Sequence, residues 1–157
     1  MSALLRERIL VVDDDANIRA LLTVLLENEG YQVLTAADGE ASIVTATTEQ
    51  PDLILLDIRM PKMDGLQACD KLRTNPATHA IPVIFLTAFN SHDRLEQAIE
   101  MGADDFLAKP IDAVELRIRI RAMLQTRSIP GEMERLGEYI KTVKALRAQA
   151  TESFQKR

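Results

Sequence analysis

Short apolar runs alternate along the chain with segments in which apolar residues recur at helical spacing. Continuous runs such as 9–12, 53–56 and 83–86 are typical of strands buried on both faces of a parallel sheet. Two further segments have the composition of strands. The predicted strands are residues 9–12, 31–36, 53–56, 83–86 and 105–108.

Helical spacing predicts five helices between and after these strands. Gly30 and Gly102 stop two of them, and Ser91 and Asp112 are expected to cap two others. Asp38-Gly39 is expected to form a turn. The predicted helices are residues 18–26, 40–49, 66–73, 91–101 and 112–125. Strands that alternate with helices in this way predict an α/β fold, a parallel sheet with both faces covered.

Size and charge narrow the class of protein. The chain has 157 residues, enough for one domain and a short appendage, and a net charge of −5. An acidic chain disfavours direct nucleic-acid binding, and no segment predicts a membrane span or a signal peptide. The lone Cys69 excludes an intramolecular disulfide. We therefore expect a cytoplasmic protein.

Polar residues end four of the predicted strands. Because parallel strands all point the same way, we expect these side chains to share one edge of the sheet. They are Asp13, Asp14 and Asp15 after the first strand, Asp57 after the third, Thr87 after the fourth and Lys109 after the fifth. Neighbouring carboxylates suit Mg²⁺. Asp57 would be a nucleophile for phosphoryl transfer, with Lys109 and Thr87 contacting the transferred oxygens.

Four motifs resemble the response-regulator receiver family of two-component signalling. They are residues 11–15 (VVDDD), 55–65 (LLDIRMPKMDG), 86–88 (LTA) and 109–110 (KP). Each is weak alone, but all four close predicted strands in the right order. The resemblance implies a flavodoxin-like, doubly wound sheet of strand order 2-1-3-4-5 with five helices. It implies a receiver domain over residues 7–125, a linker over 126–131 and a helical extension over 132–157.

The resemblance also implies roles for individual residues. Asp57 looks like the phosphoacceptor. Mg²⁺ would be held by Asp14, Asp57 and the backbone carbonyl of Arg59, with Asp13 acting through water. Thr87 and Phe106 resemble a switch pair, and Lys109, before a cis Pro110, resembles the phosphoryl-binding lysine. Arg59 and Phe89 occupy positions that tune the phosphoryl lifetime in the family.

The same resemblance implies partners. The phosphoryl group would come from a sensor histidine kinase or a phosphotransfer protein, and a downstream protein or effector domain, or a second copy of the chain, would read the switch. The chain would promote its own phosphorylation and dephosphorylation without being an enzyme for another substrate.

Three other functions are alternatives to phosphoryl acceptance. Phosphatases with an Asp nucleophile use Asp-x-Asp at the end of the first strand. Arg59 stands two residues after Asp57, and Asp13 and Asp15 have the right spacing but are followed by no further matching motif. Nucleotide-binding proteins need a glycine-rich loop that this chain lacks. The alternative that stays open is a docking module that keeps the fold and acts without phosphorylation.

Several residues have plainer interpretations. Asp15 is expected to cap a helix, Gly65 and Pro61 to shape the loop after Asp57, and Cys69 to fill space in a helix. His79 and His92 lack metal-ligand spacing. Phe106 has two interpretations: an ordinary core residue, or a member of the switch pair. Three arginines form either a solvated face or a partner surface: Arg117, Arg119 and Arg121.

Residues 132–153 are expected to form a helix after the break at 128–131. Met133, Leu136, Ile140 and Val143 recur at coiled-coil spacing, and Leu146, Ala150 and Phe154 follow with a drift. Three interpretations stay open: the stripe pairs two chains, packs on the receiver, or begins a connector to a further domain.

Overall fold

The computed structural model describes residues 6–88, 100 and 102–155 of the chain. It divides into two compact units, Met1–Pro110 and Ile111–Arg157. The first unit holds the sheet and the second holds two helices, and each is described by itself.

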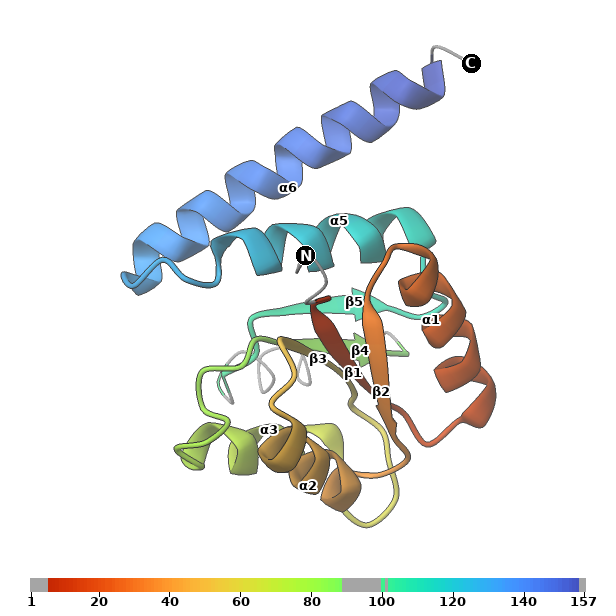
Figure 1. The fold of residues 1–157 in the computed structure, drawn as a ribbon, viewed down its shortest axis with the longest axis vertical. Helices are drawn as coiled ribbons and strands as arrows, with labels where there is room; N and C mark the ends of the chain where they lie inside the picture. Colours follow the sequence, from red (N-terminus) through yellow and green to blue (C-terminus); the bar gives the residue numbers. More distant parts are fainter. Residues whose placement is uncertain (1–5, 89–99, 101, 156–157) are drawn as a thin grey trace. The chain divides into compact units, whose positions relative to one another are not determined.

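A five-stranded parallel sheet is the centre of the first unit (Figure 1). Its order, β2-β1-β3-β4-β5, is the order predicted from the sequence. The register is continuous across the sheet, with Val11 beside Leu55 and Leu55 beside Ile84. The strands are β1 (Arg8–Val12), β2 (Gln32–Ala36), β3 (Leu53–Asp57), β4 (Val83–Thr87) and β5 (Asp105–Ala108).

Three described helices cover this sheet: α1 (Ala16–Asn28), α2 (Gly39–Glu49) and α3 (Gly65–Thr74). The helix predicted over 91–101, with its cap at Ser91, lies outside the described residues except for Glu100. Asp38 and Gly39 do not form a separate turn. The Asp38 side chain accepts from the amide of Ala41 and caps α2, so Gly39 is already helical.

The core lies on both faces of the sheet. On one face, apolar residues of β1, β3 and β4 pack with residues of α2 and α3, among them Ala46, Cys69 and Leu72. Leu22 and Leu26 of α1 are buried, and α1 contacts β1 and β2 (Figure 1). Burial of such a leucine contributes roughly 1.5–3 kcal/mol, which makes the strands a rigid frame for the residues at their ends.

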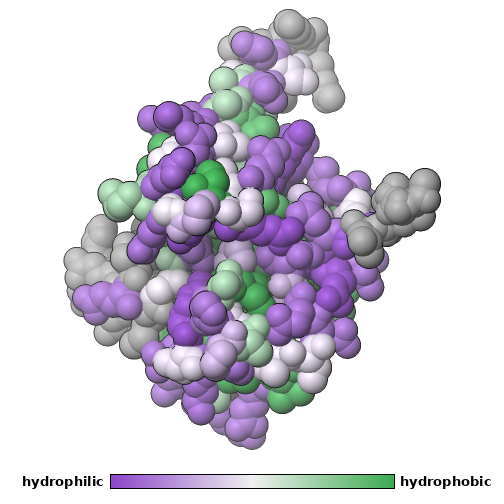
Figure 2. All heavy atoms as spheres, turned by 60° about the vertical axis from the view of Figure 1, so that its left-hand side comes forward, coloured by the Kyte–Doolittle hydropathy of each residue, from purple (hydrophilic) through white to green (hydrophobic). Residues whose placement is uncertain are grey.

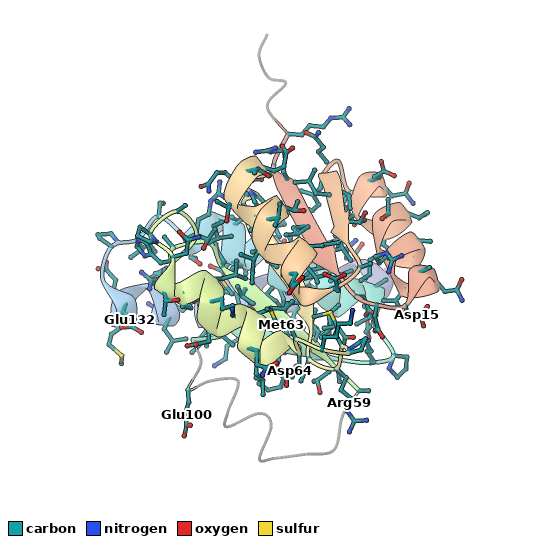
Figure 3. All side chains as sticks on the ribbon, turned by 90° about the horizontal axis from the view of Figure 1, so that it is seen from below. Asp15, Arg59, Met63, Asp64, Glu100 and Glu132 are labelled. Carbon is teal, nitrogen blue, oxygen red and sulfur yellow. The ribbon has the colours of Figure 1, made fainter. Side chains whose placement is uncertain are left out.

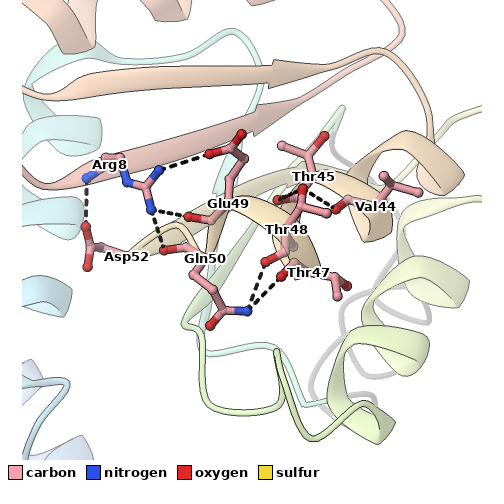
Figure 4. A network of polar contacts seen from close by, with 9 residues as sticks. Arg8, Val44, Thr45, Thr47, Thr48, Glu49, Gln50 and Asp52 are labelled. Carbon is pink, nitrogen blue, oxygen red and sulfur yellow. Dashed lines mark hydrogen bonds and ion pairs between the residues drawn. The ribbon is translucent and has the colours of Figure 1, made fainter.

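Hydrogen bonds connect the C-terminal end of α2 to the start of β1 (Figure 4). The Arg8 guanidinium donates to the carbonyls of Glu49 and Gln50 and pairs with the Glu49 carboxylate at 3.3 Å. The Arg8 amide donates to Asp52 at 2.8 Å. Gln50, left-handed with φ 50°, donates to the Ala77 carbonyl at 2.9 Å. The last carbonyls of α2 thus have partners.

Arg73 of α3 joins three segments that are far apart in sequence. Its guanidinium donates to the carbonyl of Ile81 at 2.6 Å, to that of Gly102 at 3.0 Å and to the Asp104 carboxylate at 2.7 Å. Asp104 in turn accepts from the amide of Val83 at 2.8 Å. This one side chain therefore fixes the entries to β4 and β5.

Replacing Arg73 is expected to weaken the fold. Arg73→Ala should lower the free energy of unfolding by about 2–4 kcal/mol, because it removes the donor to the carbonyls of Ile81 and Gly102 and the cation beside the Asp104 carboxylate. Arg73→Lys should recover only part of the loss, since an ammonium lacks the planar fork. Denaturant unfolding checks this, with Lys71→Ala, an exposed neighbour on α3, as the matched control. Equal losses in the alanine variants would contradict the assignment.

The second unit is an antiparallel pair of helices, α5 (Ala113–Thr126) and α6 (Glu132–Gln155) (Figure 1). Asp112 caps α5 as predicted, by accepting from the amides of Val114 and Glu115. Arg147 of α6 donates to the Glu115 carboxylate through two nitrogens, at 2.7 and 3.1 Å. The bidentate pair lowers the pKa of Glu115, with Arg119 adding to the effect.

The surface carries no broad apolar area in the view of Figure 2, where hydrophobic atoms form small separate spots among hydrophilic ones. Among the described helices, none combines the length and the hydropathy that a bilayer span requires.

Candidate functional site

The polar residues predicted to share one edge come from the ends of four strands. Asp13 follows β1, Asp57 ends β3, Thr87 ends β4 and Lys109 follows β5. Figure 3 shows Asp15 and Arg59, from the loops after β1 and β3, on the same side of the molecule. Parallel pairing of the strands thus collects residues that are up to 96 positions apart in sequence.

Lys109 bridges two buried carboxylates. Its Nζ donates to Asp13 Oδ2 at 2.9 Å and to Asp57 Oδ1 at 3.2 Å. Asp13 is fully buried and Asp57 is 3% exposed. Burial alone lowers the pKa of Lys109, but the hydrogen bond to Asp13 and the charge of Asp57 outweigh burial, so the pKa is raised. The lysine is therefore a permanent cation at this site.

Asp57 is the carboxylate of this group whose negative charge is poorly stabilised. Burial, followed by repulsion from Asp13, raises the pKa of Asp57 from 3.8 to about 6. Lys109 and the amide of Arg59, which donates to Asp57 Oδ1 at 3.4 Å, oppose the rise without cancelling it. At neutral pH the side chain is mostly an under-stabilised carboxylate, and a further positive charge would stabilise it.

The turn after β1 holds Asp13 in place. The Asp15 amide donates to Asp13 Oδ1 at 2.9 Å, and Arg19 donates to the Asp13 carbonyl at 2.7 Å. Asp15 itself accepts from the Asn17 amide and caps α1, as predicted. Arg19 was missed by the sequence analysis, because an arginine on the first turns of a helix carries no signal that it reaches back to a strand end.

Gly65 sits against the backbone of Asp57. A Cβ at this position would lie 2.2 Å from the Asp57 carbonyl oxygen, a distance that no side chain tolerates. The Gly65 amide donates to the Ile58 carbonyl at 2.8 Å, and Asp64 and Gln67 form a capping box at the start of α3. The structural role predicted for Gly65 is thus explained by the close approach of α3 to β3.

Thr87 and Phe106 share one face of the sheet. Thr87 pairs in register with Ala108, and Phe106 lies two residues before Ala108, so alternation places both side chains on the same side. Phe106 is partly buried and packs against the core. The amide of Lys109 donates to the Thr87 carbonyl at 2.8 Å, and the Lys109–Pro110 peptide bond is cis. Phe89 lies outside the described residues.

Three carboxylates are close enough to share one cation. Asp13, Asp14 and Asp57 each offer an oxygen, and these oxygens all lie within 4.8 Å of one another. Two of the residues are buried and Asp14 is exposed, so the group opens toward solvent on one side. An all-oxygen set with an open side is what Mg²⁺ prefers, since it keeps several waters. The residues present therefore fit Mg²⁺.

Among the described residues, Cys69 and His79 take no part in the chemistry of this site. Cys69 is buried in α3, and burial raises the pKa of its thiol to about 11, so it is an inert packing residue. His79 is exposed and joins no group of metal-binding side chains among the described residues, and His92 lies outside them.

Comparison with known proteins agrees with this geometry. The family model described as "Response regulator receiver domain" matches residues 9–121. The chain belongs to the response-regulator receiver family. Receiver domains are the phosphoacceptor switches of two-component signalling, so the suspected resemblance is confirmed.

The curated relatives are longer than this receiver chain. Response regulator PleD of Caulobacter vibrioides is 46% identical over 127 residues, 80% of this chain and 28% of the relative. The alkaline phosphatase synthesis transcriptional regulatory protein PhoP of Bacillus subtilis is 41% identical over 125 residues, 80% of this chain and 51% of the relative. The chain thus spans about a quarter to a half of these relatives.

Solved receivers match over nearly their whole length. The chemotaxis protein CheY4 of Vibrio cholerae has a TM-score of 0.71 and 29% identity, covering 74% of this chain and 97% of CheY4. A putative response regulator from Chloroflexus aurantiacus has a TM-score of 0.73 and 33% identity, covering 76% and 98% of the two chains. The fold of the matching part of this chain is therefore that of CheY-like receiver domains.

Because negative charge is crowded at Asp57, we expect the difference in stability between the parent and Asp57→Asn to depend on pH. With a chelator present, Asp57→Asn should raise the free energy of unfolding by on the order of 2–3 kcal/mol at pH 7, because a neutral amide removes the unfavourable carboxylate.

The sign follows from linkage. The folded pKa of Asp57, about 6, lies above the unfolded value of 3.8, so the parent loses stability as pH rises through this window. The gain from Asp57→Asn should be full above pH 6 and vanish near pH 4. Denaturant unfolding between pH 4 and 8 checks this, and a difference between the two proteins that does not change with pH would refute it.

Proposed function

We propose that Asp57 accepts a phosphoryl group from the phosphohistidine of a sensor kinase or phosphotransfer protein, in a Mg²⁺-dependent reaction. The observation that carries the proposal is the bridge from Lys109 to both Asp13 and Asp57 at the open edge of the sheet. The bridge joins Asp57, Lys109 and Asp13 in one group of side chains, which supports a role for Asp57 as the nucleophile beside a fixed cation.

The phosphoryl group passes intact from the donor imidazole to the Asp57 carboxylate. A carboxylate oxygen of Asp57 attacks phosphorus, a phosphorus–oxygen bond forms, and the phosphorus–nitrogen bond to the donor imidazole breaks. The electron pair of that bond leaves with the imidazole nitrogen. Because the pKa of Asp57 is about 6, the nucleophile is mostly unprotonated at neutral pH.

Mg²⁺ would be held by Asp14, Asp57 and the carbonyl of Arg59, with Asp13 acting through water. When bound, it would supply positive charge that offsets the charge of the carboxylates and of the phosphoryl oxygens. Lys109 remains beside Asp57 and balances charge on the transferred oxygens. Thr87, at the end of the neighbouring strand, donates its hydroxyl to one of these oxygens.

Phosphorylation then acts as a switch. A phosphoryl group adds negative charge and acceptor oxygens beside Thr87 and Lys109. Thr87 moves toward the phosphoryl group, and Phe106, on the same face of the sheet, moves inward behind it. The new arrangement favours binding of a downstream protein or effector domain. The chain thus works as a signalling switch and not as an enzyme for an external substrate.

Phosphorylation of the purified protein tests the proposal. Incubation with Mg²⁺ and acetyl phosphate or phosphoramidate should add one phosphoryl group to the intact mass. The gain should disappear in Asp57→Asn and with a chelator, and its rate should fall at least tenfold in Lys109→Ala, because one fixed positive charge is lost.

Asp52→Asn is the matched control, since Asp52 is a carboxylate immediately before β3 that accepts from the Arg8 amide instead. It should be phosphorylated like the parent. No mass gain in the parent under any condition would contradict the proposal and favour a docking module that acts without phosphorylation.

A donor protein needs a surface beside the site. Helix α1 begins directly after Asp15, and it presents Leu21 and Val24, which are 48% and 56% exposed. At 1.5 Å per residue they lie within about 12 Å of the start of α1. Two exposed apolar side chains this close to Asp14 suit a helix of the donor protein.

Negative charges on this face of α1 are expected to slow phosphoryl transfer from the donor protein but not from a small-molecule donor. Leu21→Glu and Val24→Glu should slow transfer from a phosphorylated phosphotransfer domain at least tenfold and leave phosphorylation by acetyl phosphate unchanged. Val44→Glu, at a valine on α2 that is 62% exposed, is the control. Stopped-flow or gel-based transfer rates check this, and equal slowing with both donors would show that the variants damage the site.

A further inference from the structure

Asp14 differs from the two other carboxylates that could share a cation with it. Asp13 and Asp57 are buried and accept hydrogen bonds from Lys109, whereas Asp14 is exposed. Among the described residues, none donates a hydrogen bond to the Asp14 carboxylate. The direction of the Asp14 side chain therefore depends on the backbone on either side of it.

The two peptide units that flank Asp14 are each held by a hydrogen bond. The unit between Asp13 and Asp14 carries the Asp13 carbonyl, which accepts from Arg19 Nη1 at 2.7 Å. The unit between Asp14 and Asp15 carries the Asp15 amide, which donates to Asp13 Oδ1 at 2.9 Å. Because peptide units are planar, holding both of them fixes the backbone dihedrals of Asp14 and the direction of its Cα–Cβ bond. These two hydrogen bonds thus aim the Asp14 side chain.

The position of Arg19 on α1 explains how it reaches the end of β1. Arg19 lies four residues after Asp15, the cap of the helix, and its amide donates to the Asp15 carbonyl at 3.1 Å. Side chains of a helix lean toward its N-terminus, so the guanidinium passes back over the cap toward Asp13. Arg19 is partly buried, which strengthens the hydrogen bond. One residue therefore holds the turn at two points, through its backbone and through its side chain.

We propose that Arg19 is a positioning residue for Mg²⁺ binding, because it orients the exposed ligand Asp14 through the Asp13 carbonyl. The inference rests on the proposed Mg²⁺ site. Arg19 is not itself a ligand, since a guanidinium has no acceptor atom. Groups that orient a metal ligand typically change the metal affinity by roughly 10–100-fold.

The charge of Arg19 and its positioning role predict opposite effects on Mg²⁺ binding. A guanidinium in contact with Asp13 repels a divalent cation, so its removal would on charge alone strengthen the binding. Loss of the hydrogen bond instead frees the peptide unit between Asp13 and Asp14, and the Asp14 carboxylate then has many directions available. Mg²⁺ has few protein ligands and demands strict geometry, so this freedom weakens the binding. The sign of the change therefore separates the two effects.

Titration of the isotope-labelled full chain with MgCl₂, followed by NMR through the amide resonances of the turn after β1, tests the proposal. Arg19→Met keeps an unbranched side chain but removes the donor, and it should raise the Mg²⁺ dissociation constant about tenfold. Arg19→Lys keeps a donor and should give a value between those of the parent and Arg19→Met. Glu27→Met, at an exposed charged residue in the last turn of α1, should bind Mg²⁺ like the parent. Binding by Arg19→Met that is as tight as in the parent, or tighter, would overturn the proposal.

Amide hydrogen exchange with a chelator present separates positioning from a general loss of stability. In Arg19→Met the Asp15 amide should exchange faster than in the parent, because the turn is loosened, while the amides of β3 exchange at the parent's rate. The same acceleration at Asp15 and throughout β3 would mean that the variant weakens the whole fold, and the positioning role would then be wrong.

These measurements do not depend on phosphorylation of Asp57. Weak Mg²⁺ binding by Arg19→Met supports the inference even if acetyl phosphate adds no phosphoryl group to the parent. Unchanged Mg²⁺ binding by Arg19→Met, in a parent that is phosphorylated normally, would remove the role of Arg19 and leave the proposed function standing. A parent that does not respond to MgCl₂ would overturn the metal site and the role of Arg19 together.

Discussion

The site rests on one ammonium group shared between two buried carboxylates. Asp13 and Asp57 end strands that are adjacent in the sheet, so the fold holds their charges together whether or not a cation is present. Lys109 offsets part of the repulsion, yet the pKa of Asp57 remains about 6. This residual repulsion favours added positive charge beside Asp57, which is why we propose this carboxylate as the phosphorylated group. The rigid core, the Asp15 cap and the close approach of Gly65 all serve to maintain that crowding.

Much of the first unit follows from sequence, because its signals are local. Apolar runs ending in acids located the strands, and the motif order predicted the sheet order that the structure confirms. The expectation that Asp13, Asp57 and Lys109 would meet followed from parallel strands alone. What sequence could not provide were contacts that depend on tertiary distance. Arg19 on the Asp13 carbonyl, Arg73 across three segments and the fit of Gly65 against β3 leave no local pattern.

In the second unit, the spacing of apolar residues along α6 did not predict which of them would be buried. The a–d spacing of Met133, Leu136, Ile140 and Val143 predicted one continuous apolar stripe. The structure divides it, since α5 buries Val143 while the first three remain exposed. Spacing reports which residues share a helix face but not which neighbour covers that face. The bidentate pair of Arg147 with Glu115 decides this, and it joins residues 32 positions apart. The domain boundaries expected from sequence stay a prediction.

The central claim is that the crowded carboxylate Asp57 is the phosphorylated group. Borohydride reduction of the phosphorylated protein converts an aspartyl phosphate into homoserine, and peptide mass mapping then identifies the residue. The account predicts homoserine at position 57 and unmodified aspartate at positions 13 and 14. Homoserine at either of those residues, or a phosphoryl group that survives reduction on a hydroxyl or histidine side chain, would contradict it.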